Sequence, residues 1–165
     1  MARVSNEELQ QLATELGDRL RARNWMLATA ESCTGGWVGQ LLTSLPGSSQ
    51  WYERGFITYA NAAKVEMLGV SEETLAAHGA VSEQTASAMA AGALRHSHAQ
   101  AALAISGIAG PGGGTPQKPV GLVCYGWALA DGTVMSSTCR LDGDREEIRS
   151  RAVAAALRGL IELLG

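Results

Sequence analysis

Apolar residues recur at helical spacing along several stretches of the chain. Between residues 6 and 23, leucines at positions 9, 12, 16 and 20 fall three to four residues apart, and Ser5 stands where an N-cap belongs. This pattern predicts an amphipathic helix that covers one face of a sheet. Similar spacing predicts helices at 37–45, 62–68, 82–95 and 145–164, with Ser82 as an N-cap and Ser71 opening a further short helix.

Strand-length apolar runs separate these helices. They predict strands at 25–30, 51–59, 101–106, 120–130 and 133–141, and Asp131-Gly132 predicts a two-residue hairpin between the last two. Because the early strands alternate with helices and the last two form a hairpin, we expect a mixed sheet between layers of helices. No linker or repeat interrupts the pattern, so residues 1–165 are predicted to form a single α/β domain.

Charge and hydropathy narrow the range of partners. The net charge is −3 and no basic patch is evident, so no nucleic-acid partner is expected. No apolar run reaches the roughly 20 residues that cross a bilayer, and acidic residues at positions 7, 8 and 15 do not fit a signal peptide. We therefore expect a cytoplasmic protein without a membrane partner.

The cysteines and histidines match no familiar disulfide or metal motif. Cys33, Cys124 and Cys139 are odd in number and widely spaced, which argues against a disulfide framework. His96 and His98 lie two residues apart at the end of a predicted helix, where their side chains point in different directions. No metal site is expected.

Two segments directly follow predicted strands, where open α/β sheets collect their ligands. One is the turn 31–36, and the other is the Gly- and Pro-rich loop 107–116. The glycines of the loop match neither the phosphate-binding loop of nucleoside triphosphatases nor the dinucleotide fingerprint. Its unobstructed N–H groups suit an anion-binding nest, and a flexible connection between strands is the alternative interpretation.

Ser32 lies in the first of these turns, where its hydroxyl group and the following N–H groups share one space. It is a candidate nucleophile, or alternatively the N-cap of the next helix. A nucleophilic serine needs a base. Glu31 is adjacent, but neighbouring side chains at a turn diverge, and the absence of histidine from both segments disfavours a Ser-His-Asp triad. Lys64 is the remaining base, because an apolar pocket can lower the pKa of a lysine; the alternative is a solvated helix lysine, in a chain with only two lysines.

Four blocks of residues carry a family resemblance. They are 30–36 (AESCTGG), 59–64 (YANAAK) with 68–70 (LGV), 79–82 (GAVS), and 106–113 (SGIAGPGG) with 118–121 (KPVG). The closing 143–145 (GDR) with Arg149 also fits. In this order the blocks resemble the CinA C-terminal-domain family over nearly the whole chain. The resemblance implies a three-layer α/β/α sandwich with a mixed, mostly parallel sheet.

Enzymatic members of this family are nicotinamide mononucleotide amidases, which form nicotinate mononucleotide and ammonia. The resemblance therefore implies such an activity without metal or cofactor, with Ser32 as nucleophile, Lys64 as its base and Tyr59 as a hydroxyl that assists proton transfer. The predicted contacts of the nucleotide substrate are Glu31, Cys33, Thr34, Gly35, Gly36, Ser48, Ser106, Gly107, Ile108, Ala109, Gly110, Gly112, Gly113 and Arg145. The oxyanion is expected to bind N–H groups of 33–36 or of the Gly-rich loop.

The resemblance also implies a homo-oligomer, a dimer or larger. Larger family members carry an additional N-terminal domain, whereas this chain is expected to be the stand-alone form without the pyrophosphatase activity of that domain. Ser106 replaces a threonine that is common in the family and keeps its hydroxyl group. The alternative function is a non-catalytic pyridine-nucleotide sensor or interaction protein, which would bind nucleotide without releasing ammonia.

Overall fold

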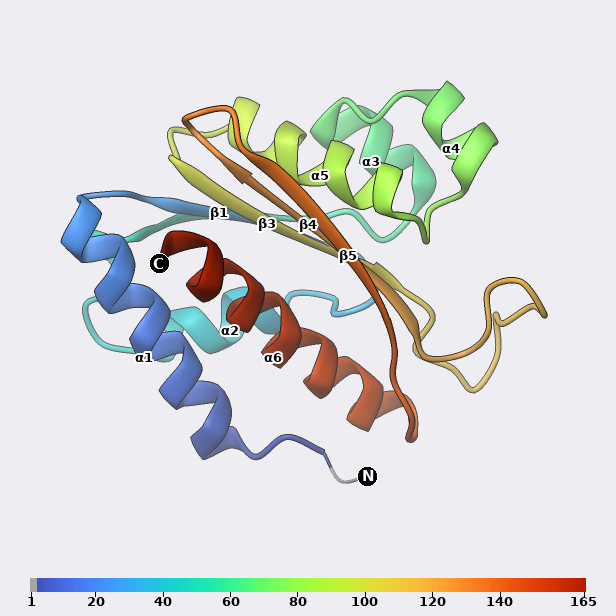
Figure 1. The fold of residues 1–165 in the computed structure, drawn as a ribbon, viewed down its shortest axis with the longest axis horizontal. Coiled ribbons are helices and arrows are strands. Elements are labelled where there is room, and N and C mark those ends of the chain that lie inside the picture. Colours follow the sequence, from blue (N-terminus) through green and yellow to red (C-terminus); the bar gives the residue numbers. More distant parts are fainter. Residues whose placement is uncertain (1–2) are drawn as a thin grey trace.

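Five strands lie side by side in the order β2-β1-β3-β4-β5, with helices on both faces of the sheet (Figure 1). The computed structural model describes residues 3–165. The strands are β1 (Leu27–Glu31), β2 (Tyr52–Ile57), β3 (Ala101–Gly107), β4 (Leu122–Leu129) and β5 (Val134–Arg140). The helices are α1 (Asn6–Arg23), α2 (Trp37–Thr43), the short 3₁₀ helix η1 (Ser48–Gln50), α3 (Asn61–Leu68), α4 (Glu72–His78), α5 (Glu83–Arg95) and α6 (Arg145–Leu164).

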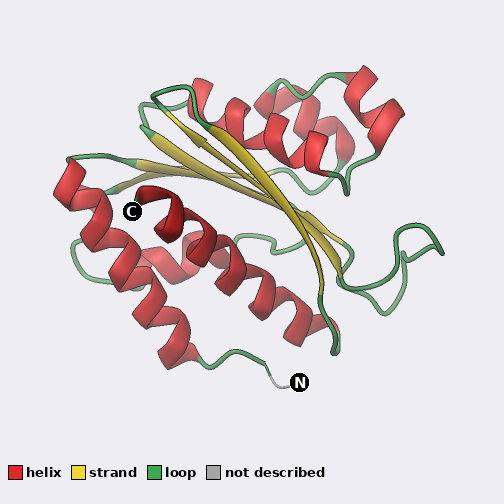
Figure 2. Ribbon diagram, in the orientation of Figure 1, coloured by secondary structure: helices red, strands yellow, loops and turns green. Residues whose placement is uncertain are grey.

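The sheet is mixed, as the sequence predicts. β1 pairs in parallel with β2 and with β3, whereas β4 is antiparallel to both β3 and β5. Four strands therefore run in one direction, and β4 runs against them. Helices α1, α2 and α6 cover one face and α3, α4 and α5 cover the other, so that Figure 2 shows a yellow sheet between two red layers. The predicted α/β/α sandwich is confirmed.

Residues of different size face the two helical layers. Along β3 and β4, large buried side chains such as Leu103, Ile105 and Trp127 pack against α1 and α6. The alternate positions of β1, β3 and β4 carry alanine and pack against α3 and α5. Because successive strand residues point to opposite faces, this pattern leaves one thick core and one thin core. Helix α5 lies so close to the sheet that a Cβ at Gly126 would overlap the backbone carbonyl oxygen of Ala86.

Side-chain caps open the helices that position the site. The hydroxyl groups of Ser5 and Ser82, both predicted caps, each accept a hydrogen bond of 3.1 Å from the N–H three residues further on. Helix α6 opens with a capping box in which Asp144 accepts from Glu147 N (2.9 Å) and the Glu147 carboxylate accepts from Asp144 N (3.1 Å). Each cap satisfies N–H groups that the first helical turn leaves without a partner.

The hairpin between β4 and β5 differs from the two-residue turn that the sequence predicts. Leu129 N donates to Thr133 O at 2.9 Å, which leaves three residues, 130–132, in the loop. A two-residue type I′ turn needs a positive φ at both central residues. Only Gly132 has one, with a φ of 95°, while the Asp131 carboxylate accepts from Thr133 N at 2.9 Å. The other predicted boundaries agree closely with the observed elements.

The cysteines are free thiols distributed over the sheet and its connections. Cys33 follows β1, whereas Cys124 and Cys139 lie in β4 and β5. Over residues 3–165, no three His, Cys, Asp or Glu side chains gather as metal ligands would. None of the helices in that range combines the length and the apolar character needed to cross a bilayer.

The close approach of α5 to the sheet can be tested at Gly126. We expect Gly126→Ala to lower the free energy of unfolding by about 2 kcal/mol or more, because the new methyl group meets backbone rather than a movable side chain. Urea unfolding followed by circular dichroism measures the change. Gly112→Ala is the control, since no atom lies within 4 Å of the added Cβ. Equal stability of the two variants would contradict the close packing of α5.

Candidate active site

Ser32 occupies the turn at the carboxyl end of β1. Its N–H donates to Ile105 O of the neighbouring strand β3 at 3.0 Å, which continues the sheet by one residue. Its side chain faces Lys64, whose Nζ lies 3.0 Å from Ser32 Oγ although the two residues are 32 apart in sequence. Both residues are buried, with Ser32 8% exposed and Lys64 1% exposed. The tertiary structure therefore joins the predicted nucleophile to its predicted base.

The amine of Lys64 is surrounded by oxygen acceptors. Besides Ser32 Oγ, Nζ lies 2.7 Å from the carbonyl oxygen of Thr58 and 3.3 Å from that of Tyr59. No carboxylate of residues 3–165 forms an ion pair with it. Burial lowers the pKa of Lys64 below its ordinary value, because the charged form loses its hydration. A neutral amine here can donate to both carbonyl groups and accept the Ser32 proton with its lone pair.

Glu31 satisfies the amino end of α2. Its buried carboxylate accepts from Thr34 Oγ1 (2.7 Å) and from the N–H groups of Gly36 (3.3 Å), Val38 (2.9 Å) and Gly39 (3.1 Å). The structural N-cap of α2 is Gly36, which has a φ of 104° and no side chain. The interpretation of Ser32 as the N-cap is therefore wrong. The Glu31 carboxylate accepts the hydrogen bonds from the first N–H groups of α2, and the Ser32 hydroxyl group contacts Lys64 instead.

A small cavity of about 180 Å³ opens onto Ser32 and Lys64. It is lined by Ser32, Cys33, Tyr59, Lys64, Ala80, Val81, Ser106, Gly107, Ala109 and Arg145. Tyr59 is 64% exposed at its mouth, where its hydroxyl group lies 3.3 Å from Arg145 Nη2. Arg145, in the first turn of α6, also donates to Gly110 O at 2.8 Å. The cavity therefore has a buried serine hydroxyl group at its base and a cationic group at its rim.

The Gly-rich loop meets this cavity only at its beginning. Gly107 and Ala109 line the cavity, whereas the N–H of Ile108 donates a hydrogen bond to Leu122 O at 2.9 Å. The N–H groups of Ala109, Gly110, Gly112 and Gly113 donate to no group of residues 3–165. These N–H groups without a partner lie in a loop whose Gly110 carbonyl oxygen accepts from Arg145, a combination that has the chemistry of an anion site.

Several predicted contact residues do not line the cavity. Ile108, Gly110, Gly112 and Gly113 lie along the outer loop, while Glu31, Thr34, Gly35 and Gly36 form the structural side of the Ser32 turn. Ser106 does line it, but its hydroxyl group donates to Ala80 O at 2.7 Å. Ser48 is separated from the cavity, because it precedes β2 whereas Ser32 follows the parallel strand β1. The two serines therefore lie at opposite ends of the sheet.

Sequence reasoning missed four residues at this site. Ala80 and Val81 line the cavity, and Thr58 supplies a carbonyl oxygen to Lys64. Arg149 of α6 donates from Nε to Cys33 O and from Nη2 to Thr34 O, both at 3.0 Å. Ala80, Val81 and Arg149 lie in segments that carry the family resemblance, which was the available signal. Thr58 contributes only its backbone carbonyl group, and the sequence holds no signal for such a contact.

Cys33 also lines the cavity, and its thiol is buried. Burial raises the pKa of its thiol to about 12, and the nearby Arg149 charge opposes this rise only in part. The thiolate is the reactive form of cysteine, so a thiol with this pKa stays protonated at neutral pH. Of the two side chains, the Ser32 hydroxyl group is therefore the better candidate nucleophile.

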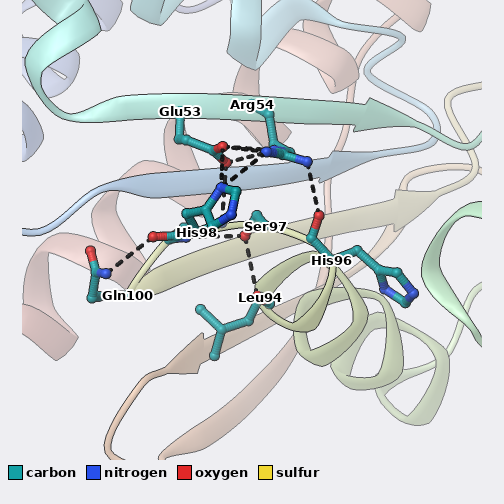
Figure 3. Close-up of polar contacts among 8 residues, drawn as sticks. Glu53, Arg54, Leu94, His96, Ser97, His98 and Gln100 are labelled. Carbon is teal, nitrogen blue, oxygen red and sulfur yellow. Dashed lines mark hydrogen bonds and ion pairs between the residues drawn. The ribbon is translucent and has the colours of Figure 1, made fainter.

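A second polar cluster lies near the start of β2, at the far end of that strand from the cavity. Figure 3 shows Glu53 and Arg54 beside His98, whereas the His96 ring points elsewhere. Arg54 Nη1 donates to His96 O at 3.1 Å, and His98 Nδ1 lies 3.3 Å from Glu53 Oε1 (Figure 3). Hydrogen bonds from Arg54 hold the pKa of the Glu53 carboxyl below its usual range. These contacts fasten the turn after α5 to the edge strand.

Known proteins similar to this chain match it over nearly its whole length. The nicotinamide-nucleotide amidohydrolase PncC of Escherichia coli strain K12 is 50% identical over 157 residues, which are 95% of each chain. The PncC of Pseudomonas putida is 50% identical over 153 residues, 92% of this chain and 94% of the relative. A crystal structure of a competence/damage inducible protein from Agrobacterium tumefaciens matches with a TM-score of 0.94 and 45% identity, over 100% of this chain and 99% of that one.

A family model covers the same extent. The model described as the CinA C-terminal domain matches residues 9–164, a range that holds the Ser32 turn, Lys64, the Gly-rich loop and α6. The resemblance seen in the sequence blocks is thus confirmed by an independent comparison. The chain belongs to the CinA C-terminal domain family.

Proposed function

We propose that this protein hydrolyses the carboxamide of nicotinamide mononucleotide, with Ser32 as nucleophile and Lys64 as its base. The observation that carries the proposal is the contact of 3.0 Å between the buried Lys64 Nζ and Ser32 Oγ, in which Lys64 forms no ion pair with a carboxylate of residues 3–165. Similar proteins from two bacteria are named nicotinamide-nucleotide amidohydrolases, and they supply the substrate class.

The reaction follows from the protonation states of the pair. Neutral Lys64 takes the proton of Ser32 Oγ as the oxygen attacks the carboxamide carbon, and a tetrahedral oxyanion forms. The C–N bond then breaks, and the nitrogen leaves as ammonia with the proton returned from Lys64. Lys64 next activates a water molecule, whose attack on the acyl-enzyme ester releases the nicotinate product and restores Ser32.

The size of the cavity suits the reacting end of this substrate. At about 180 Å³ it lies below the roughly 300–1,000 Å³ that is common for whole drug-sized ligands. We therefore place the pyridine ring and carboxamide inside, and the ribose and phosphate at the rim beside Arg145, Tyr59 and the open N–H groups of 109–113. A guanidinium group is well suited to a fixed contact with phosphate.

The catalytic pair predicts the behaviour of two substitutions. Ser32→Ala and Lys64→Met should each reduce ammonia release from nicotinamide mononucleotide at least about 10⁴-fold, and the double variant should lose little more, because the residues act as a unit. Methionine keeps the length and burial of the lysine stem, which limits the effect on folding. Ammonia is measured with a coupled assay in the presence of a chelator.

Lys118→Met, at the other lysine of the chain, is the matched control and should keep wild-type activity. Circular dichroism confirms that each variant is folded. Full activity of the folded Lys64→Met variant would exclude the Ser-Lys mechanism. A folded wild type that binds the nucleotide without releasing ammonia would instead identify a sensor.

The lowered pKa of Lys64 predicts a pH dependence. Protonated Lys64 cannot take the serine proton, so kcat/KM should rise with pH as the amine becomes neutral and level off below 10.5, the ordinary pKa of lysine. Initial rates between about pH 6 and pH 10 measure this rise of kcat/KM. Cys33→Ala should show the same rise of kcat/KM over the same pH range, since a thiol with a pKa of about 12 does not titrate there. If the pH at which kcat/KM rises changes in Cys33→Ala, the titrating group is the thiol and not Lys64.

A further inference from the structure

Arg149 lies on α6 one turn after Arg145, so that both side chains point toward the active-site end of the sheet. Arg145 reaches the rim of the cavity, whereas Arg149 reaches the back of the Ser32 turn. The Arg149 guanidinium donates to two successive carbonyl groups, those of Cys33 and Thr34, at 3.0 Å each. It also stacks over the Trp37 ring, 5.3 Å from its centroid. The group is therefore held in one orientation.

This contact sets the direction of the peptide groups that follow the nucleophile. In a planar trans peptide the C=O and N–H groups point in opposite directions. Because Arg149 holds the Cys33 carbonyl toward α6, the N–H of Thr34 points away from α6. The N–H groups of Cys33 and Thr34 donate to no group of residues 3–165, whereas the N–H of Gly35 donates to Ser32 O at 3.1 Å.

The charge of Arg149 acts in the same direction as its hydrogen bonds. Among residues 3–165 it forms no ion pair with a carboxylate. Burial raises the pKa of the Cys33 thiol, and Arg149 opposes that rise, which places its positive charge within electrostatic reach of the turn. A hydrogen bond to a carbonyl oxygen polarises the amide and strengthens the N–H of the same peptide as a donor.

We propose that Arg149 is a positioning residue that orients and polarises the peptide group between Cys33 and Thr34, whose N–H, that of Thr34, binds the oxyanion formed at Ser32. The inference deepens the proposed function and rests on it for the identity of the substrate. Arg149 itself touches no reacting atom. A purely structural link between α6 and the turn would change stability, whereas a positioning role changes the rate of the chemical step.

Steady-state kinetics separate these two roles. Loss of a single oxyanion donor lowers kcat about 10²- to 10³-fold in other enzymes, so loss of its positioning group should lower kcat by about 10- to 100-fold in Arg149→Ala. KM for nicotinamide mononucleotide should change less than about threefold, since ground-state binding does not use the oxyanion hole. Guanidinium ion added to Arg149→Ala should restore part of kcat. Arg158→Ala, which removes an exposed arginine of the same helix, is the matched control.

A fluorophosphonate probe tests the same step without the nucleotide. Ser32 Oγ attacks phosphorus, fluoride leaves and the serine proton passes to Lys64, while a phosphoryl oxygen takes the place of the oxyanion. The rate of Ser32 labelling, followed by intact-protein mass spectrometry, should fall at least about tenfold in Arg149→Ala and remain unchanged in Arg158→Ala. If the wild type is labelled but releases no ammonia, the proposed substrate is wrong, and the ratio of labelling rates still decides the role of Arg149.

Three results would overturn the inference. The first is folded Arg149→Ala with a kcat and a labelling rate within about twofold of wild type. The second is an increase in KM at unchanged kcat, which would make Arg149 a binding residue. The third is a wild type whose Ser32 is not labelled at all, which would remove the activated serine and with it both proposals.

Discussion

The amine of Lys64 is buried between a serine hydroxyl group and two backbone carbonyl groups, and within the described residues 3–165 it forms no ion pair with a carboxylate. A buried charge without a partner is destabilising by several kcal/mol, so the fold favours the neutral amine. A carboxylate at this place would stabilise the ammonium form and remove the base. The rest of the site follows from this constraint, because Ser32 must be close, Glu31 must be directed elsewhere and solvent must be limited to a small cavity.

The Ser32 turn divides two tasks between adjacent residues. Helix α2 begins without a side chain at its N-cap, and its N–H groups would lack partners if the Glu31 carboxylate did not accept from them. Ser32 points the other way, toward α3. The alternation of side chains at the end of a strand makes this division possible, since neighbours diverge. One residue therefore stabilises the structure while the next remains available for chemistry.

The thin, alanine-lined side of the sheet positions Lys64. Small side chains on β1, β3 and β4 let α5 approach closely, and α3 packs beside α5 at the carboxyl end of β1. On the other face, the capping box at Asp144 determines where α6 begins and therefore where Arg145 and Arg149 lie. The active-site end is thus held from both layers, by a lysine on one side and two arginines on the other.

The sequence by itself determined the elements and the caps at Ser5 and Ser82, and it singled out the two loops of the candidate site, because apolar periodicity and turn residues are local signals. Elimination of the other bases left Lys64 as the candidate base, and the family resemblance then implied that it serves Ser32, whereas spacing alone could not show that the two residues meet. The tertiary structure alone decided that they meet, that Glu31 caps α2 across seven residues, and that Ser48 lies at the opposite end of the sheet. These relations depend on strand order, strand direction and contacts between distant residues, which local patterns do not encode.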